Sequence, residues 1–346
     1  MSTPRRLPER DLAEITTLAE DDLSALEGAR IFVTGGTGFI GTWLVEALLA
    51  ADRELGLRLG LTLLTRDSSG YRHRRPHVAG DGRVTLLEGD VRMFTESEPH
   101  DFVVHAATPT SAAHTPAERS ALYANIVHGM ERVLEVASAW GCPRLLFTSS
   151  GAVYGRQPPD LLRVSEDHPS GPDPLSTEMT YHEGKRAAEL QGALSTEAAQ
   201  VDVVVARLFA FVGPLLPTDA HFAIGNFIRD ALDGGPVVVE GDGTPVRSYQ
   251  YATDLVVWLL AILNRGEPGR AYNVGSNEVV DVATVAKAVA EATGTLEVEI
   301  RGRSERTELP ERYVPDCERA CLELGVANTV VLSEAIRRTL AWHRTN

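Results

Sequence analysis

The stretch ARIFVTGGTGFIGTWLVEALLAAD, residues 29–52, decides the fold of this chain. Its first residues, 29–34, are expected to form a buried strand, and a helix should begin near residue 39. A G-x-x-G-x-x-G turn lies between them. Glycines allow a tight turn and close approach to a pyrophosphate, and a helix N-terminus offers free N–H groups to phosphates. Three glycines alone also suit a structural turn, but between strand and helix they predict a dinucleotide site at Gly35, Gly38, Phe39, Ile40 and Gly41.

The rest of the chain repeats this alternation of strand and helix. Further strands are expected at 61–65, 83–90, 101–108, 143–150 and 201–209, and long helices near 116–140 and 180–198. This pattern predicts an α/β fold with a doubly wound parallel (Rossmann) sheet and a smaller C-terminal substrate-binding domain. The expected parts are an N-terminal helical extension at 1–28 with a helix over 9–27, a dinucleotide-binding domain at 29–210 joined by 247–275, and a substrate-binding domain at 211–246 and 276–346.

Tyr181 and Lys185, in the segment YHEGKRAAEL, are spaced to share one face of a helix. Free tyrosine has a pKa of ~10, too high for a base at neutral pH. A unit charge at ~4 Å is worth ~4 kcal/mol at an effective dielectric of ~20, so a neighbouring ammonium would bring the phenol to roughly pH 7. The pair therefore predicts a base that takes the proton of an alcohol while a hydride leaves for the cofactor.

The end of the second expected strand bears on the choice between NAD and NADP. Thr65 and Arg66 stand where an acidic residue would bind the ribose 2′-OH of NAD, and Asp67 follows. Arg66 would pair with a 2′-phosphate, helped by a basic loop. The expected cofactor is therefore NAD(P), with NADP slightly favoured over NAD. In the alternative, Asp67 reaches the ribose and the arginines are solvated. Asp90 and Val91 are expected at the adenine edge, although Asp90 also suits a turn. The loop arginines are Arg72, Arg74 and Arg75.

Composition narrows the possible partners. The formal net charge of −15 argues against nucleic acid and against an anionic membrane, since both need a basic face. The N-terminus MSTPRRLPERDLAEI lacks the apolar segment of a secretory signal, and no apolar run reaches the ~18 residues of a membrane span. The cysteines are expected to be reduced thiols without a metal, as in a cytoplasmic protein. They are Cys142, Cys317 and Cys321.

Six motifs in this order resemble the extended short-chain dehydrogenase/reductase family, in particular its nucleotide-sugar epimerase, dehydratase and decarboxylase branch. They are TGGTGFIG (34–41), GDV (89–91), HAAT (105–108), TSSGAVYG (148–155), YHEGK (181–185) and RSYQYATDL (247–255). The resemblance covers about 29–340. It implies a nucleotide-diphosphate sugar as substrate and a homodimer formed through the helices near 116–140 and 180–198.

The resemblance also implies roles for individual residues. Tyr181 would be the catalytic tyrosine, Lys185 would also hold the nicotinamide ribose, and Ser150 would hydrogen-bond the reacting sugar oxygen. Further residues would contact the cofactor, namely Ser149, Ala106, Ala107, Thr108 and Asn125. Others would contact the nucleotide or its phosphates, namely Asn226, Arg247 and Arg312. The alternatives are that the two serines cap a strand end and that the two arginines form surface ion pairs.

The chain departs from this branch next to Ser150. Dehydratases and decarboxylases carry acidic residues in patterns such as TDEVYG, whereas this chain has Gly151 and Ala152. A 4,6-dehydratase needs an additional acid and base there, but a C4 epimerase does not. Ala210 also replaces a common asparagine. The sequence therefore predicts an NAD(P)-dependent epimerase. The alternatives are a 4-ketoreductase, a UDP-glucuronate decarboxylase (which YHEGKR and HAATPTSAAH most resemble), a 4,6-dehydratase, and a non-catalytic dinucleotide-binding module.

Overall fold

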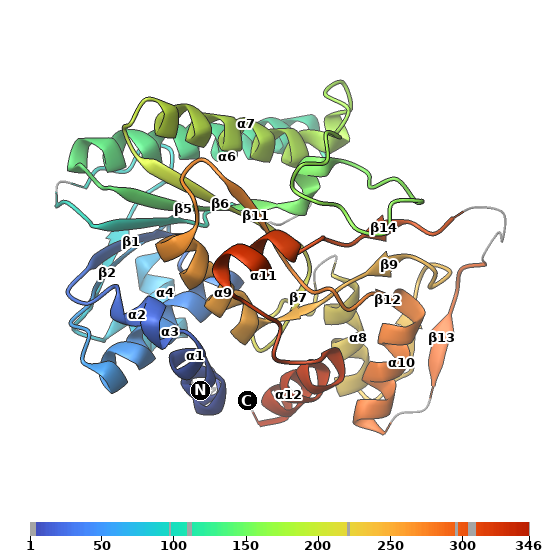
Figure 1. Ribbon diagram of the computed structural model, residues 1–346. Helices are drawn as coiled ribbons and strands as arrows, with labels where there is room; N and C mark the ends of the chain where they lie inside the picture. The colour runs from blue at the N-terminus through green and yellow to red at the C-terminus, as the bar shows by residue number, and fades with distance from the viewer. Residues whose placement is uncertain are drawn as a thin grey trace.

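The computed structural model describes residues 5–96, 98–108, 113–219, 222–294, 297–303 and 309–345. Part of the HAATPTSAAH segment, 109–112, lies outside them. The described residues form a seven-stranded parallel sheet of order β11-β6-β5-β4-β1-β2-β3 (Figure 1). Its strands are β1 (Arg30–Thr34), β2 (Gly60–Thr65), β3 (Val84–Glu88), β4 (Phe102–His105), β5 (Arg144–Ser150), β6 (Asp202–Leu208) and β11 (Ala271–Val274). The predicted α/β fold with a doubly wound sheet is confirmed.

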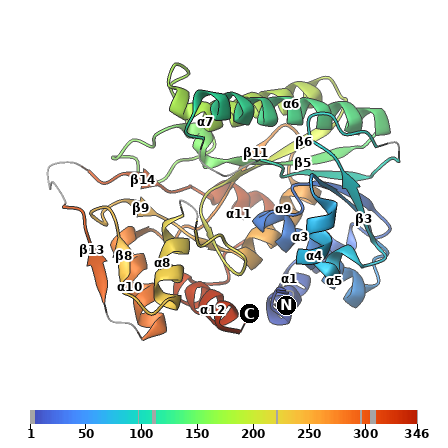
Figure 2. The ribbon, with the colours of Figure 1, turned by 180° about the vertical axis from the view of Figure 1, so that it is seen from behind.

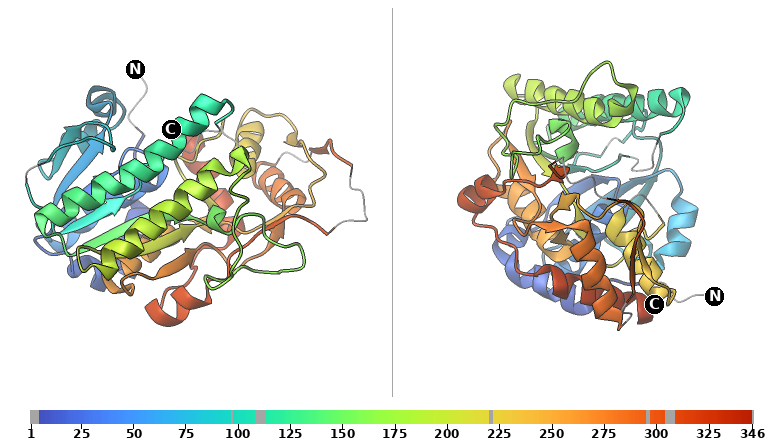
Figure 3. Two further views of the ribbon diagram at one scale, coloured as in Figure 1. Left: turned by 90° about the horizontal axis from the view of Figure 1, so that it is seen from above. Right: turned by 90° about the vertical axis from the view of Figure 1, so that its right-hand side faces the viewer.

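Successive residues of the strands face opposite sides of the sheet, which explains their continuous apolar sequences. In β1, Ile31 and Val33 pack into one core while Phe32 packs into the other. The first core is covered by α3 (Phe39–Leu55), α9 (Ala252–Arg265) and α11 (Glu318–Leu324), together with the N-terminal helices. The second is covered by α6 (Pro116–Trp140) and α7 (Thr180–Glu197), which lie side by side across the sheet (Figures 1 and 3).

Short helices connect several of the larger elements. Two of them lie between β2 and β3, a third follows β5 and a fourth precedes α7. Figure 2 shows α4 and α5 beside α3 and β3. These helices are α4 (Ser68–Arg74) and α5 (Pro76–Ala79), and the 3-10 helices are η1 (Gly151–Tyr154) and η2 (Thr177–Met179).

In the described part of the chain, no helix is both long and apolar enough to cross a lipid bilayer.

The C-terminal part has a separate core between helices and small sheets. Its helices are α8 (Ala223–Leu232), α10 (Val282–Thr293) and α12 (Leu332–Thr345). Its strands are β7 (Phe211–Val212), β8 (Val237–Val239), β9 (Val246–Arg247), β10 (Gln250–Tyr251), β12 (Val280–Asp281), β13 (Val298–Ile300) and β14 (Arg312–Tyr313). They pair as β10-β7, β12-β9-β14 and β13-β8. The domain boundaries expected above stay a prediction.

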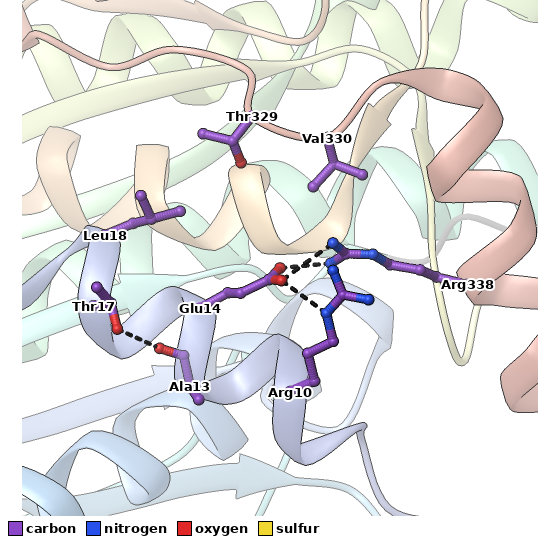
Figure 4. A pocket seen from close by; sticks show the side chains of 8 residues that line it. All are labelled: Arg10, Ala13, Glu14, Thr17, Leu18, Thr329, Val330 and Arg338. Carbon is purple, nitrogen blue, oxygen red and sulfur yellow. Dashed lines mark hydrogen bonds and ion pairs between the residues drawn. The ribbon is translucent and has the colours of Figure 1, made fainter.

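The N-terminal extension differs from the single helix expected over 9–27. It forms α1 (Glu9–Leu18) and α2 (Glu20–Ser24), and the helix is interrupted at Ala19, whose φ of −115° and ψ of 22° are not helical. Asp11 of α1 is buried and accepts hydrogen bonds from Tyr251 Oη at 2.6 Å and from Arg338 Nη1 at 3.0 Å. Glu14 lies between Arg10 and Arg338 in a small pocket (Figure 4). The extension thus connects α12 to the rest of the molecule.

Candidate functional site

A cavity of about 990 Å³ lies beyond the carboxyl ends of the central strands. Gly35 follows β1, Ala106 follows β4, Ser150 ends β5 and Phe209 follows β6, and all four line it. The other wall comes from the C-terminal part and includes Tyr313 of β14. A parallel sheet places ligands at this edge because the loops after its strands converge there.

The glycine turn forms one wall of the cavity. Gly35 has a φ of 73°, and a Cβ built there would lie 2.4 Å from the carbonyl carbon and oxygen of Ala106. A Cβ on Gly41 would lie 2.2 Å from the carbonyl oxygen of Gly35. A Cβ on Gly38 would make only an ordinary contact, 3.5 Å from the carbonyl oxygen of Gly35. α3 begins after Gly38 without a side-chain cap, and Phe39 and Ile40 also lie at the cavity wall. Uncapped N–H groups at a helix start fit the pyrophosphate of a dinucleotide.

Lys185 is buried on α7, at the base of the cavity. Its Nζ donates to Thr108 Oγ1 at 2.8 Å and to the Thr148 carbonyl oxygen at 2.7 Å. Burial lowers the pKa of Lys185 to about 7, against the opposing charge of Glu189. His105, at the end of β4, is buried as well, and burial with the nearby Lys185 charge lowers its pKa to about 3. His105 is therefore neutral at physiological pH.

The expected lowering of the Tyr181 pKa by Lys185 is not found. Burial raises the pKa of Tyr181, and a hydrogen bond with Ser150 opposes this rise. Lys185 Nζ lies 5.9 Å from the centre of the Tyr181 ring and is held by its own hydrogen-bond acceptors. Desolvation of the buried phenolate is the largest influence on the Tyr181 pKa in this protein.

Ser149 and Ser150 have different surroundings although both line the cavity. Ser149 Oγ donates to Glu189 Oε1, and the same carboxylate accepts from Arg207 Nη2 at 2.7 Å. This ion pair ties β5, β6 and α7 together behind the cavity. Ser150 Oγ accepts from the backbone N–H of Ala152 at 3.2 Å, so it also caps η1. The capping role and the predicted contact with substrate are compatible, because a hydroxyl has two lone pairs and one proton.

Aromatic side chains occupy the space beside Ser150. A Cβ built on Gly151 would lie 2.6 Å from Cζ of Phe209, so the Phe209 ring fills the space that a side chain at 151 would need. The Phe209 and Tyr313 rings pack with centroids 4.7 Å apart. Ala152 is buried at the cavity wall. The site thus presents rings and hydroxyls beside Ser150, and positions 151 and 152 carry no acidic side chain.

Asp67, at the end of β2, has two partners within the protein. Asp67 caps α4 by accepting from the backbone N–H of Gly70 at 2.7 Å, and it pairs with Arg74 at 3.2 Å. Arg66 is exposed. Asp90 pairs with Arg92 at 2.8 Å, and these hydrogen bonds lower the pKa of Asp90 to about 2.

The other arginines of the basic loop have partners within the protein. Arg72 Nη1 donates to the Ala79 carbonyl oxygen, and Arg75 is partly buried against Glu46. Together with the Arg74–Asp67 pair, these contacts leave Arg66 as the loop cation best placed to meet a ligand at the end of β2.

The structure brings most of the predicted cofactor residues to the cavity. Those lining it are Gly35, Gly38, Phe39, Ile40, Gly41, Ala106, Thr108, Ser149, Tyr181 and Lys185. Others lie behind or beside the wall: Val91 is in the core, and Ala107 donates its N–H to Thr34 Oγ1. Arg66, Asp90 and Asn125 also lie outside the lining of the cavity. The roles of all these residues stay predictions.

Some of the predicted substrate residues line the cavity, and others lie outside its lining. Arg247 lines the cavity and also pairs with Glu311 at 2.7 Å. Asn226 lies outside the lining and accepts from Arg229 Nη1 at 3.3 Å. Arg312 Nε donates to the Pro159 carbonyl oxygen, and its neighbour Tyr313 faces the cavity instead. Sequence reasoning did not select Tyr313. Strand alternation was the available signal, because adjacent residues of β14 face opposite sides.

Comparison with known proteins agrees with this architecture. The model of the NAD dependent epimerase/dehydratase family matches residues 31–275. UDP-glucuronic acid decarboxylase 1 from Xenopus tropicalis is 30% identical over 326 residues, which cover 93% of this chain and 74% of that protein.

Two solved structures are similar over nearly their whole length. A dTDP-glucose 4,6-dehydratase from Streptomyces venezuelae with NAD and TYD bound is 25% identical, with a TM-score of 0.77 and coverage of 92% of this chain and 97% of that one. A UDP-glucose 4-epimerase from Thermotoga maritima with UDP-glucose is 24% identical, with a TM-score of 0.76 and coverage of 91% and 99%. NAD is named in the family description and is bound in the dehydratase structure, and neither supports the expected preference for NADP.

Proposed function

We propose that this chain, which belongs to the NAD dependent epimerase/dehydratase family and is an enzyme of nucleotide-sugar metabolism, is a nucleotide-sugar epimerase. It would invert a sugar hydroxyl, at C4, by transient oxidation and re-reduction. The observation that carries this proposal is the space beside Ser150. Gly151 and Ala152 supply no acid or base there, and the Phe209 ring fills the volume of a side chain at 151.

The chemistry divides among a few side chains. A bound oxidised nicotinamide would supply the acceptor and donor of a hydride at the sugar carbon, and its positive charge would favour the Tyr181 phenolate. Tyr181 takes the hydroxyl proton during oxidation and gives it back during reduction. Ser150 donates a hydrogen bond to the same sugar oxygen. Lys185, held by Thr108 and Thr148, supports the nicotinamide ribose. Between the two steps the keto sugar must rotate, for which a cavity of about 990 Å³ leaves room.

A second candidate is decarboxylation of a nucleotide-activated uronic acid. It is favoured by the 30% identity to UDP-glucuronic acid decarboxylase 1. It begins with the same C4 oxidation, after which the β-keto acid loses CO2. Among the described residues that line the cavity, Glu178 is the single carboxylate. It is exposed on η2 and is distant in sequence from Ser150. The absence of an acid at 151 and 152 therefore favours the epimerase.

The test is incubation of the purified protein with UDP-, dTDP-, GDP- and CDP-sugars, with products identified by NMR. An epimer without net change of NAD(P)H supports the proposal. Stoichiometric loss of NAD(P)H identifies a ketoreductase, release of CO2 a decarboxylase, and a 4-keto-6-deoxy sugar a dehydratase. The Tyr181→Phe protein serves as the control, because it should lose at least about 100-fold in turnover while still binding dinucleotide. Full turnover of that variant would overturn the assignment of the base.

The finer features of the site follow the same proposal. The substrate is a nucleotide-diphosphate sugar whose phosphates meet Arg247 at the cavity wall. NADP is accepted through Arg66, since Asp67 is engaged with Gly70 and Arg74. The three cysteines are free thiols, which supports the expected cytoplasmic location.

The predicted homodimer would form through α6 and α7. Leu190 and Leu194 are 62% and 55% exposed on α7, one helical turn apart, and Tyr123 is 42% exposed on α6. They lie on two helices that cover one face of the sheet (Figure 3). Exposed apolar side chains on such a face support a protein–protein contact there.

A further inference from the structure

Ser150 lies next to a second tyrosine, Tyr313, which comes from β14 in the C-terminal part of the chain. The Tyr313 hydroxyl is 3.5 Å from Ser150 Oγ and 3.4 Å from the Leu208 carbonyl oxygen. Ser150 also hydrogen-bonds to Tyr181 and accepts from the N–H of Ala152. One serine hydroxyl therefore lies among two phenols and a backbone donor.

Tyr313 is held in this place by the packing of its ring and by hydrogen bonds of the residues on either side of it. Its ring packs against Phe209, which is itself packed over Gly151. The backbone on either side is also fixed, because Arg312 donates to the Pro159 carbonyl oxygen and the Val314 N–H donates to Gln157 Oε1 at 2.9 Å. Burial raises the pKa of Tyr313, so its phenol keeps its proton and remains a hydrogen-bond donor.

The number of protons limits how these groups can be arranged. A serine hydroxyl has one proton and two lone pairs. If Tyr313 donates to Ser150 Oγ, that bond and the Ala152 N–H occupy both lone pairs, so the single Ser150 proton points to the Tyr181 hydroxyl and to the sugar oxygen that would bind beside it. If instead Tyr313 donates to Leu208, Ser150 would donate to Tyr313, and its proton would be withheld from the sugar. Both contacts are long, as catalytic hydrogen bonds often are before substrate binds.

We propose that Tyr313 is a positioning residue for the reaction, because its hydroxyl donates to Ser150 Oγ and thereby directs the Ser150 proton to the reacting sugar oxygen. This inference rests on the proposed function, in which Ser150 stabilises that oxygen. Tyr313 acts through Ser150 and takes no proton from the substrate itself.

The test is a double-mutant cycle of Tyr313→Phe and Ser150→Ala. Each variant is measured in the reaction that the wild type catalyses, by product formation and by nicotinamide absorbance. Tyr313→Phe should lower kcat about tenfold with KM changed less than about twofold. In the Ser150→Ala background the same change should cost nothing further, because the group through which Tyr313 acts is gone.

The matched control is Tyr272→Phe, a buried tyrosine of β11 whose hydroxyl contacts Glu323 and the Glu267 N–H away from the cavity. It should leave kcat unchanged, and thermal denaturation of every variant checks folding. An unchanged or faster Tyr313→Phe enzyme would overturn the inference and favour donation to Leu208. Losses that add in the double variant would overturn it too. The identity of the wild-type product tests the proposed function separately, because a different product leaves the cycle measurable.

Discussion

Lys185 shows how a single residue is changed by its surroundings. Burial lowers its pKa from 10.5 to about 7 in the folded protein, so between these values the unfolded chain binds more protons than the folded one. Stability contributed by this residue should therefore rise as pH increases from about 7 toward 10 and be lowest below 7. We expect the difference in unfolding free energy between wild type and Lys185→Met to follow this direction in urea titrations.

Lys287→Met, at an exposed lysine of α10, is the matched control for removing a lysine side chain, and its unfolding free energy should differ from that of the wild type by less than about 0.5 kcal/mol. A wild type whose stability relative to Lys185→Met is independent of pH across this window would contradict the lowered pKa of Lys185.

Arg66 gives the second prediction at the residue scale. It is exposed at the end of β2, where a 2′-phosphate would lie. Arg66→Ala should weaken NADP binding about tenfold, the size of one charge-assisted hydrogen bond, and leave NAD binding within about twofold. Isothermal titration with both dinucleotides measures this. Arg72→Ala, whose guanidinium contacts Ala79, should change neither affinity. Equal losses for NAD and NADP in Arg66→Ala would disprove a role in discrimination.

The strand–turn–helix unit is the element on which the cofactor site depends. The turn after β1 lies so close to α3 that a Cβ at Gly41 would lie 2.2 Å from the Gly35 carbonyl oxygen. Gly41→Ala must therefore displace the turn, and we expect dinucleotide affinity to fall at least about tenfold. Fluorescence titration checks this, with Gly82→Ala as control, since a Cβ at Gly82 meets nothing within 4 Å. Unchanged affinity in Gly41→Ala would mean that the turn does not hold the pyrophosphate.

The N-terminal helix α1 is a structural element rather than a loose extension. Asp11 is buried and joins Tyr251 to Arg338 of α12. Asp11→Ala should lower the unfolding free energy by about 2 kcal/mol, because the Tyr251 hydroxyl loses its acceptor while Arg338 keeps Glu14 and Glu334. Urea denaturation measures the change. The control is Asp21→Ala, at an exposed residue of α2, which should lower the unfolding free energy by less than about 0.5 kcal/mol. An equally small loss for Asp11→Ala would show that α1 does not stabilise the fold in this way.

At the scale of the whole molecule, the exposed side of α7 carries the prediction of a dimer. Leu190 and Leu194 lie opposite the buried Ala188 and Gly192. Leu190→Glu should convert a dimer to monomer in analytical ultracentrifugation, because a charge would be buried in the interface. Leu322→Glu, at a leucine of α11 that is 76% exposed, is the matched control and should leave the assembly intact. A wild type that sediments as a monomer would overturn the homodimer.

Local sequence patterns were sufficient for six of the seven strands of the sheet. The expected strands at 29–34, 61–65 and 143–150 correspond to β1, β2 and β5, and the expected helix near 116–140 to α6. These elements were predictable because apolar periodicity and glycine turns act over short stretches. The last strand of the sheet, β11 (Ala271–Val274), was not singled out, because a short apolar segment has no signature apart from the sheet it joins. The break at Ala19 was missed because the apolar pattern continues across it.

The sequence by itself determined the parallel sheet, the glycine turn at its edge and the spacing of Tyr181 with Lys185, because each depends on residues close together in the chain. Only the tertiary structure decided what surrounds the reacting centre. It placed Tyr313, and not Arg312, beside Ser150, and it filled the space at Gly151 with Phe209. It also determined the pKa of Lys185, since burial is produced jointly by strands and helices from distant parts of the chain, and no local pattern records it.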